Sequence, residues 1–543
     1  MSAKRLNRLR AKWGKPVERA RQLDALAVAQ ASRLALSPSK QSLDNRTWAD
    51  LNLDAVFAVV DRCESTLGQQ ALYHRLRCAP SGDNLDAFES LVERFTADRP
   101  LRERAQTALT RLQDPQGYDV WWLGRPGAVE RPAWYRVFPV LTTAALTSVA
   151  MAPWWPFAAF VMLLVNMAVR YATHAYVAAL AQGIRQCAPL IKTAAVLAFL
   201  AGDDIDPIVR PLREDAPGLR RLKFISSWIN ANPFMVSLDS NPLAIVLNDF
   251  VTVLYEYLNM LLLLDGSAVF FAAKDIDLRN GALLRIVAAT GEVDAAISVA
   301  SFRAGREDWI RPLFSALGPA TFQELRHPLI ADSVPNSIVL RPGKGVLVTG
   351  SNMSGKSTFL RTVGVNIVLA QTINTCLARE YLAPMFDVRS CIGRSDDLLA
   401  GKSYYLVEVE ALLGLVRLSE SPAAHLFLLD ELFRGTNAIE RIAAGQAVLQ
   451  ELIEGSSAPK RHVVLAATHD GELVDLLPQL YDAYHFGDSI GAEGLVFDHR
   501  LKSGRATTRT ALALLRQSGA PKRLLERAAA TASLLDNQRA ARN

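Results

Sequence analysis

Residues 350–358 read GSNMSGKST and have the spacing of a loop that binds nucleotide phosphates. Gly350, Gly355, Lys356 and Ser357 occupy the fixed places of the pattern G-x-x-x-x-G-K-[ST]. In such a loop the backbone amides and the lysine ammonium contact phosphate oxygens, and the hydroxyl after the lysine reaches Mg²⁺. The segment therefore predicts a nucleoside triphosphate, ATP or GTP, as the ligand. The other places of the predicted nucleotide-binding segment are filled by Ser351, Asn352, Met353, Ser354 and Thr358.

Two adjacent acids, Asp430 and Glu431, follow the apolar run Leu426–Leu429. A carboxylate at the end of such a run can hold Mg²⁺ together with the Ser357 hydroxyl, and we expect Asp430 to do so. We expect Glu431 to act as the general base that polarises the attacking water. Adjacent acids can also form a solvated loop, but the phosphate loop upstream favours the catalytic interpretation.

A histidine follows the next apolar run. His469 comes after Val463–Ala467, where an imidazole can form a hydrogen bond to the γ-phosphate or to the attacking water. A lone histidine at the end of a strand is an unspecific signal, but its position predicts a second catalytic residue. Two polar segments flank the acids, Lys402–Tyr405 before them and Arg434–Asn437 after them, and the second is suited to contact another nucleotide site.

These side chains must be brought to one edge of a sheet. The apolar run Gly345–Thr349 predicts a buried strand before the phosphate loop, and Phe359–Ala370 predicts a helix after it. From Arg311 onward, short β-branched runs alternate with helical patterns, which is typical of an α/β nucleotide-binding domain. We place this domain at residues 311–515 and a C-terminal helical segment at 516–543. Its strands are expected at Ser337–Leu340, Gly345–Thr349, Leu426–Leu429 and Val463–Ala467.

Upstream of residue 311 the apolar spacing is mainly helical. We expect one helical part over residues 46–136 and a second over 175–310. A length of 543 residues corresponds to about three to four domains. The five cysteines have no C-x-x-C spacing and are interpreted as reduced core residues, and the N-terminus has no apolar stretch of a signal peptide. A cytoplasmic chain is therefore expected.

Residues 1–45 form a basic N-terminal arm. Between Lys4 and Arg21 there are eight Lys or Arg residues and one acid, Glu18. Such an arm can bind nucleic acid or an anionic membrane surface. A solvated helix end without a partner explains the same composition equally well.

An uncharged, strongly apolar run extends from Val137 to Val169, over 33 positions. Pro153–Pro156 interrupts it near the middle. A single membrane span needs about 20 apolar residues, so the run is too long for one span and short for two. We predict a helical hairpin over residues 137–174 that inserts into a membrane, with both ends on the cytoplasmic side because arginines flank it. A hairpin that is buried or packs against a partner protein is the alternative.

Together these segments resemble the ATPase of the MutS family of DNA mismatch repair proteins, a branch of the ABC-type ATPases. Thr349–Thr358 reads TGSNMSGKST, beside the family's TGPNMGGKST, and Asp430–Thr436 reads DELFRGT, beside DEIGRGT. Further matches to family motifs are Ser403–Val409, Thr468–His469 and Arg326–Leu329. The resemblance covers roughly residues 45–135 and 281–530.

The resemblance implies an α/β fold in which an ABC-type P-loop ATPase domain follows a mainly α-helical core and lever domain. It implies ATP and Mg²⁺ as cofactors, a homodimer, and double-stranded DNA as a partner. Ser403 would reach across the dimer to the γ-phosphate bound by the other subunit. The expected function is that of a MutS-related ATPase that hydrolyses ATP, binds DNA and is attached to the inner face of a membrane through residues 137–174.

The sequence also departs from the family. The helical core begins near residue 45, so no mismatch-reading domain is expected before it, and the apolar hairpin lies where the family extends its levers. Residues 331–340 contain no aromatic side chain to stack on adenine. Two alternatives therefore stay open: an ATP-switched membrane scaffold without a DNA role, and an ABC-transporter-like ATPase. A single hairpin and the lack of an L-S-G-G-Q segment before Leu426 argue against the transporter.

Overall fold

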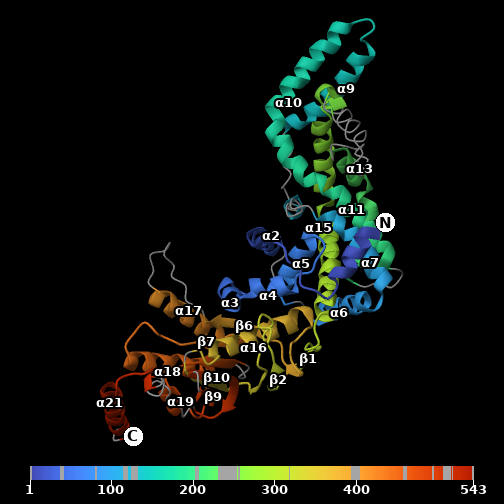
Figure 1. Cartoon of the computed structure of the whole chain (residues 1–543). Coiled ribbons are helices and arrows are strands. Elements are labelled where there is room, and N and C mark those ends of the chain that lie inside the picture. Colours follow the sequence, from blue (N-terminus) through green and yellow to red (C-terminus); the bar gives the residue numbers. More distant parts are fainter. Residues whose placement is uncertain are drawn as a thin grey trace. The chain divides into compact units, whose positions relative to one another are not determined.

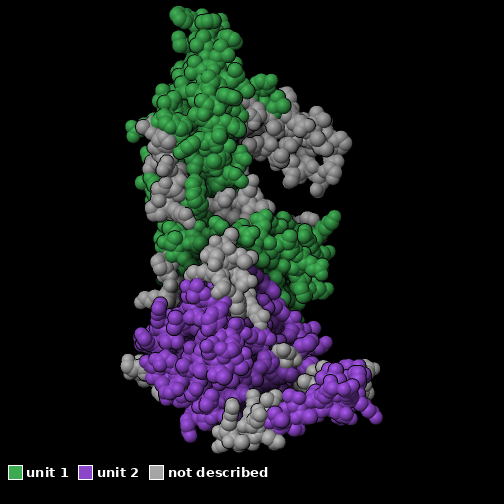
Figure 2. Space-filling model, turned by 90° about the vertical axis from the view of Figure 1, so that its left-hand side faces the viewer, with its two compact units in different colours: residues 1–40, 57–76, 80–306 green, residues 41–56, 77–79, 307–543 purple. Residues whose placement is uncertain are grey.

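The computed structural model describes residues 3–36, 42–79, 82–113, 120–123, 133–201, 207–229, 253–254, 257–316, 318–351, 353–392, 404–455, 462–491, 494–505, 515–516 and 518–540. The chain divides into two compact units. Unit 1 comprises residues 1–40, 57–76 and 80–306, and unit 2 comprises residues 41–56, 77–79 and 307–543 (Figure 2). The fold is mixed α/β: the described part of unit 1 is helical, and both sheets belong to unit 2.

Unit 1 is organised around the long helix α15 (Leu264–Ala304) (Figure 1). Helix α5 (Thr66–Arg77) approaches α15 closely because Gly291 has no side chain, and a Cβ there would lie 2.7 Å from the carbonyl oxygen of Leu67. Asp294 of α15 accepts hydrogen bonds from the backbone N–H groups of Glu64 (3.0 Å) and Ser65 (2.7 Å), and so satisfies donors at the start of α5. The other helices wholly in unit 1, apart from the hairpin, are α1 (Ala3–Lys12), α2 (Leu23–Leu36), α6 (Gly82–Ala97), α7 (Arg99–Leu109), α8 (Val120–Leu123), α11 (Cys187–Ala201), α12 (Arg210–Glu214) and α13 (Arg220–Ile229).

Part of the basic arm is docked on unit 1. Arg10 of α1 pairs with Glu103 of α7, with 2.8 Å between Nε and Oε1. Arg19 and Arg21 both bind the buried carboxylate of Asp61, at 2.6 and 2.8 Å. Three of the eight basic residues between Lys4 and Arg21 are therefore used inside the unit. Exposed basic residues on α1 include Lys4, Arg5 and Arg8.

The uncharged run forms two helices, α9 (Val137–Ala150) and α10 (Pro156–Arg185), which pack against each other and project from the rest of unit 1 (Figure 1). The chain turns between them, and Trp154 and Trp155 are 76% and 69% exposed there. Helix α10 continues past residue 174, the expected end of the hairpin. Within the described residues, only the helical stretch Pro156–Leu200 has the length and apolar composition needed to cross a membrane.

Unit 2 contains a six-stranded sheet in the order β10-β9-β4-β8-β7-β6 and a four-stranded sheet in the order β1-β5-β2-β3. In the larger sheet all neighbours are parallel except β9 and β10. Its strands are β4 (Gly345–Thr349), β6 (Asp387–Cys391), β7 (His425–Asp430), β8 (Val463–Ala467), β9 (Tyr481–Gly491) and β10 (Gly494–Ser503). The smaller sheet consists of β1 (Leu313–Phe314), β2 (Ala320–Leu325), β3 (Asn336–Leu340) and β5 (Glu380–Ala383).

The helices of unit 2 include α16, which directly follows β4 and the phosphate loop. They are α3 (Asn45–Asp50), α16 (Lys356–Ile373), α17 (Tyr404–Ser419), α18 (Ala438–Glu454), α19 (Glu472–Leu476) and α21 (Lys522–Ala540), while α4 (Leu53–Val60) has residues in both units. The four strands expected from the sequence are β3, β4, β7 and β8, and the expected helix lies within α16. The sequence did not indicate β5, β6 or the β9–β10 pair.

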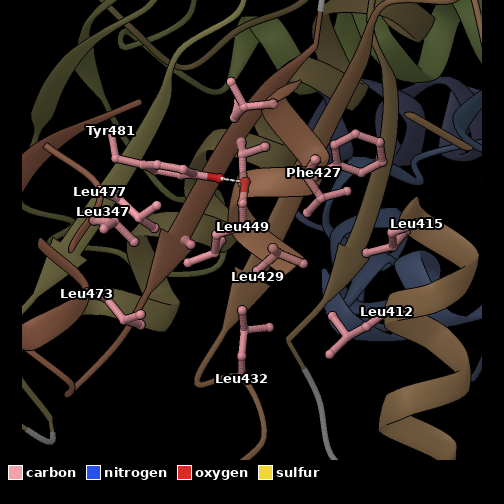
Figure 3. Close-up of a cluster of buried hydrophobic side chains, with 14 of the residues drawn as sticks. Leu347, Leu412, Leu415, Phe427, Leu429, Leu432, Leu449, Leu473, Leu477 and Tyr481 are labelled. Carbon is pink, nitrogen blue, oxygen red and sulfur yellow. Dashed lines mark hydrogen bonds between the residues drawn. The ribbon is translucent and has the colours of Figure 1, made fainter. Parts of the chain in front are cut away.

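A buried apolar cluster joins the larger sheet to α17 and α18 (Figure 3). Phe427 and Leu429 of β7 and Leu449 of α18 are fully buried in it. The Tyr481 hydroxyl at the start of β9 donates a hydrogen bond to the carbonyl oxygen of Leu449 at 2.8 Å. This core fixes the strands whose carboxyl ends carry the predicted site residues.

Candidate nucleotide-binding site

The phosphate loop joins the central strand β4 to the first turn of α16. Gly350 and Gly355 have φ values of 147° and 115°, in the region that favours glycine. A Cβ at Gly350 would also lie 2.9 Å from the Ser354 hydroxyl and 3.0 Å from the Phe486 carbonyl oxygen. Both fixed glycines of the pattern are thus required by the backbone. The loop reaches the start of an 18-residue helix, whose N-terminus favours anions.

Lys356 is nearly buried, and its ammonium points back into the loop. Nζ donates hydrogen bonds to the carbonyl oxygens of Gly350 and Ser351, both at 2.9 Å, and lies 3.3 Å from Nε2 of His469. Burial lowers the pKa of this ammonium. A cation held at this depth by backbone carbonyls is well placed to contact phosphate oxygens.

Asp430 lies at the carboxyl end of β7, beside the start of α16. The Ser357 hydroxyl donates a hydrogen bond to Oδ2 of Asp430 at 2.5 Å. The second carboxylate oxygen, Oδ1, is buried and has no hydrogen-bond partner within the described residues. Burial raises the pKa of this carboxyl, and a neighbouring divalent cation would favour its ionised form.

The pair Asp430 and Ser357 fits the ligands expected for Mg²⁺. A buried carboxylate oxygen without a partner and a hydroxyl next to it are hard oxygen donors. Across the described ranges no group of three or more His, Cys, Asp or Glu side chains could hold a metal ion by itself. Mg²⁺ commonly takes one or two protein ligands and completes its shell with water and phosphate oxygens, so two donors suffice.

Glu431 and His469 meet at the same edge of the sheet. Nε2 of His469 lies 2.7 Å from one carboxylate oxygen of Glu431, and Nη1 of Arg434 lies 2.5 Å from the other. The peptide N–H of Glu431 donates to the carbonyl oxygen of Ala467 at 2.9 Å, which ties the acid to strand β8. Burial, followed by the Lys356 ammonium, lowers the pKa of His469. The neutral imidazole that results can donate or accept a proton.

Asp470, next to His469, is fixed by a residue that the sequence did not single out. Arg441 of α18 donates from Nε (2.8 Å) and Nη2 (2.7 Å) to the two carboxylate oxygens of Asp470. Such a two-point contact restricts the loop that carries His469. The sequence gives no specific pattern for Arg441, because an arginine on a helix surface is common.

A cavity of about 300 Å³ opens beside the phosphate loop. Lys356, Ser357 and Glu431 line it on one side, and His499 and Phe486 line it from the β9–β10 pair. The lining also includes Asn336, Met353, Gly355 and Thr358. The cavity thus extends from the phosphate loop to a partly apolar region, as a nucleotide with a base and phosphates requires.

His499 is held against the phosphate loop. Its Nδ1 lies 3.0 Å from the carbonyl oxygen of Ser354, and its own carbonyl oxygen accepts a hydrogen bond from Nδ2 of Asn336 at 3.0 Å. The backbone of His499 has a φ of 50° at an irregularity in the pairing of β9 and β10. Phe486 and His499 thus bring two rings to the lining of the cavity, whereas residues 331–340 contain no aromatic side chain.

Two predicted site residues, Asn352 and Ser403, lie outside the described residues. The structure brings the other predicted groups, Ser357, Asp430, Glu431 and His469, together around Lys356. Among the variable positions of the loop, Ser354 is fully buried and Met353 is 84% exposed.

Fold and site together define a mixed α/β protein in which a phosphate-binding loop follows the central strand of a largely parallel sheet, with two acids and a histidine at the neighbouring strand ends. Residues 346–536 match the family model described as MutS domain V. This segment and its relatives therefore relate the chain to the MutS family through residues 346–536.

Curated relatives support the assignment. The chain is 35% identical over 270 residues to "DNA mismatch repair protein MutS" of Thermus aquaticus, an alignment that covers 48% of this chain and 32% of the relative. It is 34% identical over 260 residues to "DNA mismatch repair protein MutS 2" of Halobacterium salinarum, covering 46% and 29%. This chain thus spans about a third of the length of the relatives that it matches.

Proposed function

We propose that unit 2 binds ATP with Mg²⁺ and hydrolyses it to ADP and phosphate. The observation that carries the proposal is the convergence of Lys356, Ser357, Asp430, Glu431 and His469 at one sheet edge. Ser357 and Asp430 would hold Mg²⁺, which neutralises phosphate charge when bound. Adenine selectivity would depend on the region around Phe486 and His499.

In this proposal Glu431 takes the proton of the attacking water, and His469 orients the water or the terminal phosphate. Glu431 is engaged by His469 and Arg434 in the structure described here. Lys356 and Arg434 are both cations that a triphosphate would attract, so nucleotide binding would compete with Glu431 for them. When the triphosphate binds, one carboxylate oxygen of Glu431 would then become available to the attacking water.

The test is steady-state ATP hydrolysis by Glu431→Gln. We expect ATP binding to persist and turnover to fall by about 10²- to 10⁴-fold, the usual contribution of a general base. Glu454→Gln, which changes an exposed carboxylate at the end of α18, is the matched control and should hydrolyse ATP at the wild-type rate. Near-normal turnover by Glu431→Gln would rule out its role as base.

We also propose that hydrolysis requires a homodimer in which Ser403 completes the partner's site. Lys356→Ala and Ser403→Ala would each be inactive alone. A mixed dimer would regain one intact site, formed by the wild-type Lys356 of one subunit and the wild-type Ser403 of the other. Recovery of ATPase activity on mixing and exchanging subunits is expected, whereas no recovery would place Ser403 outside the partner's site.

We propose double-stranded DNA as a partner, because the relatives are called DNA mismatch repair proteins and exposed cations remain on α1. Binding to duplex DNA should weaken as the salt concentration rises. Replacing Lys4, Arg5 and Arg8 with Gln should reduce the slope of log affinity against log salt concentration by about 3 if each side chain contacts a phosphate. A slope near zero for the intact chain would instead favour the ATP-switched scaffold without a DNA role.

Finally, we propose that the α9–α10 hairpin attaches the chain to the cytoplasmic face of a membrane. Large apolar side chains on both helices face outward, including Val140 (65% exposed), Phe157 (76%) and Phe160 (56%). Such a continuous exposed apolar surface marks a contact with lipid or protein. The uncharged parts of the two helices, residues 137–150 and 156–169, are each about 21 Å long at 1.5 Å per residue, less than the ~30 Å hydrocarbon core. Entry from one side therefore fits better than a full crossing.

Flotation with phosphatidylcholine vesicles tests this attachment. Replacing Trp154 and Trp155 with Ser should release the chain into the soluble fraction, because both side chains are exposed at the turn of the hairpin. The same pair of changes leaves the nucleotide site in unit 2 untouched, so ATP binding serves as the control for folding. Unchanged flotation would argue against insertion by this hairpin.

A further inference from the structure

A second cavity, of about 160 Å³, lies at the base of the hairpin, between α10 and the start of α15. Its volume far exceeds the ~10–15 Å³ that one water molecule requires. Part of its lining is apolar and closely packed: a Cβ at Gly266 would lie 2.6 Å from the ring of Phe138, and Leu263 also lines the cavity.

Basic side chains lie among the mostly apolar and neutral residues that line the cavity. Arg170, His174 and Arg185 of α10 line it, and Asp265 is the one acidic side chain in the described lining. Asp265 is itself engaged, because its carboxylate accepts a hydrogen bond from the side-chain amide of Asn259. Within the described lining the two arginines, which stay charged, outnumber the single carboxylate.

The donors are held in place by the protein. Nε of Arg185 donates to the carbonyl oxygen of Ile229 at 3.0 Å, which fixes the guanidinium on the α13 side. The backbone N–H of Asp265 donates to Oδ1 of Asn259 at 2.9 Å, and Asn259 is only 2% exposed. Arg170 is the first charged residue after the uncharged run. Arg170 thus lies at the end of the uncharged run, and Arg185 lies about four turns further along α10.

We propose that this cavity binds the phosphate group of an anionic phospholipid. Guanidinium groups match phosphate oxygens in geometry and charge. A position at the end of the uncharged segment corresponds to the headgroup level of a bilayer. The inference rests on the proposed membrane attachment and extends it from apolar insertion to recognition of a headgroup. Free phosphate offers the same chemistry, so the experiment must separate the two sources.

The cavity can be tested without a bilayer. The full chain in a non-ionic detergent is titrated with short-chain phosphatidylglycerol and, separately, with inorganic phosphate, and the melting temperature is recorded. Stabilisation by the lipid alone supports the proposal. Because the phosphate loop of unit 2 can also bind inorganic phosphate, only the melting transition of unit 1 is compared. Equal stabilisation of unit 1 by inorganic phosphate retains a phosphate site but overturns the lipid assignment, and no stabilisation of unit 1 by either ligand overturns the site.

Variants distinguish the cavity from general attraction of basic residues to an anionic surface. Arg170→Gln should weaken binding to phosphatidylglycerol by about 10- to 100-fold, the loss expected for a hydrogen bond to a charged group. Arg136→Gln removes the same charge at the other end of the uncharged run, outside the cavity lining, and should cost at most about fivefold. Arg170→Lys keeps the charge, should fold like the wild type, and should still bind several-fold more weakly because the planar fork is lost.

Flotation then compares phosphatidylcholine vesicles with vesicles of equal parts phosphatidylcholine and phosphatidylglycerol. The wild type should prefer the anionic vesicles, and Arg170→Gln should lose most of that preference while still floating with phosphatidylcholine. A chain that floats with neither vesicle refutes membrane attachment, whereas attachment without a difference between Arg170→Gln and Arg136→Gln refutes the headgroup site.

Discussion

Two glycine-to-alanine substitutions in unit 2 should have opposite effects on stability. Gly364 lies in α16, where a Cβ would come within 2.6 Å of Cδ1 of Leu428 and 2.8 Å of a methyl group of Leu51. Carbon atoms pack at about 3.5–4.0 Å, so these side chains must move by about 1 Å. Gly414 lies inside α17, and a Cβ there would meet nothing within 4 Å.

Both variants gain the same helix propensity when glycine is replaced by alanine, and this gain cancels when their stabilities are compared. Alanine stabilises a helix interior by about 1 kcal/mol relative to glycine, and this gain applies to both positions. Only Gly364→Ala adds an overpacking cost, which is about 1–3 kcal/mol in a well-packed core. The free energy of unfolding should therefore be lower for Gly364→Ala than for Gly414→Ala by about 1–3 kcal/mol.

For a unit of this size the difference corresponds to about 2–12 °C in melting temperature. Both variants are measured by calorimetry on the full chain in the same detergent, and the transition of unit 2 is the one that Gly414→Ala moves upward. If the melting temperature of Gly364→Ala equals or exceeds that of Gly414→Ala, the close packing of α16 on β7 is wrong. The position of the phosphate loop at the start of that helix is then wrong as well.

Three further outcomes are expected. Asp50→Ala should destabilise unit 2 by about 1.5–3 kcal/mol, because the buried Oδ2 of Asp50 accepts hydrogen bonds from the Ser390 hydroxyl (2.7 Å) and the Ile392 N–H (2.8 Å). Chemical denaturation measures the free energy of unfolding, and a change below about 0.5 kcal/mol would contradict this prediction. Arg441→Met should lower the turnover number of ATP hydrolysis with little change in KM, because the substitution frees the loop that carries His469 and leaves the cavity lining unchanged. An effect on KM alone would refute the role of Arg441 in positioning His469. In unit 1, burial raises the pKa of Asp294 from 3.8 to about 7, so its contribution to stability is complete below pH 3.8 and is lost as the pH rises to 7. Burial lowers the pKa of His74 from 6.5 to about 2, so its contribution is present above pH 6.5 and is lost as the pH falls, and the two effects oppose each other between pH 4 and 6.5. In His74→Gln the melting temperature of unit 1 should therefore fall as the pH rises over this interval. A melting temperature that does not change with pH would show that the pKa of Asp294 is not raised.

The phosphate side of the site could be predicted because its signals are local. Gly350, Gly355, Lys356 and Ser357 are fixed by one turn between a strand and a helix, so their spacing alone defines the geometry. Asp430 could be placed because it ends an apolar run, and parallel strands bring such ends to one edge. In both cases a few neighbouring residues determine the position of the side chain.

Other features could not be predicted because they depend on contacts far apart in sequence. The strands β5 and β6 are short and only partly apolar, and they are recognisable as strands through their pairing with β1, β2 and β7. The docking of the basic arm depends on Asp61 and Glu103, which meet its arginines only in the folded unit. Composition alone therefore overstated how much of the arm's charge stays exposed.

The base side of the cavity shows most clearly where local reasoning fails. His499 lies where the register of β9 and β10 shifts between Phe497 and Leu501. Asn336 from another sheet binds the backbone of His499 inside this shift and of Leu501 at its end. None of these contacts leaves a periodic pattern in the sequence, so the position of the His499 ring beside the phosphate loop could not be predicted. In the proposed function the phosphate loop binds the phosphates, whereas the preference for a base would depend on an irregular strand pair about 140 residues further along the chain. We therefore expect His499→Ala to reduce the preference for ATP over GTP more than it reduces affinity for inorganic triphosphate, since the imidazole lies beside the loop without replacing any of its phosphate donors.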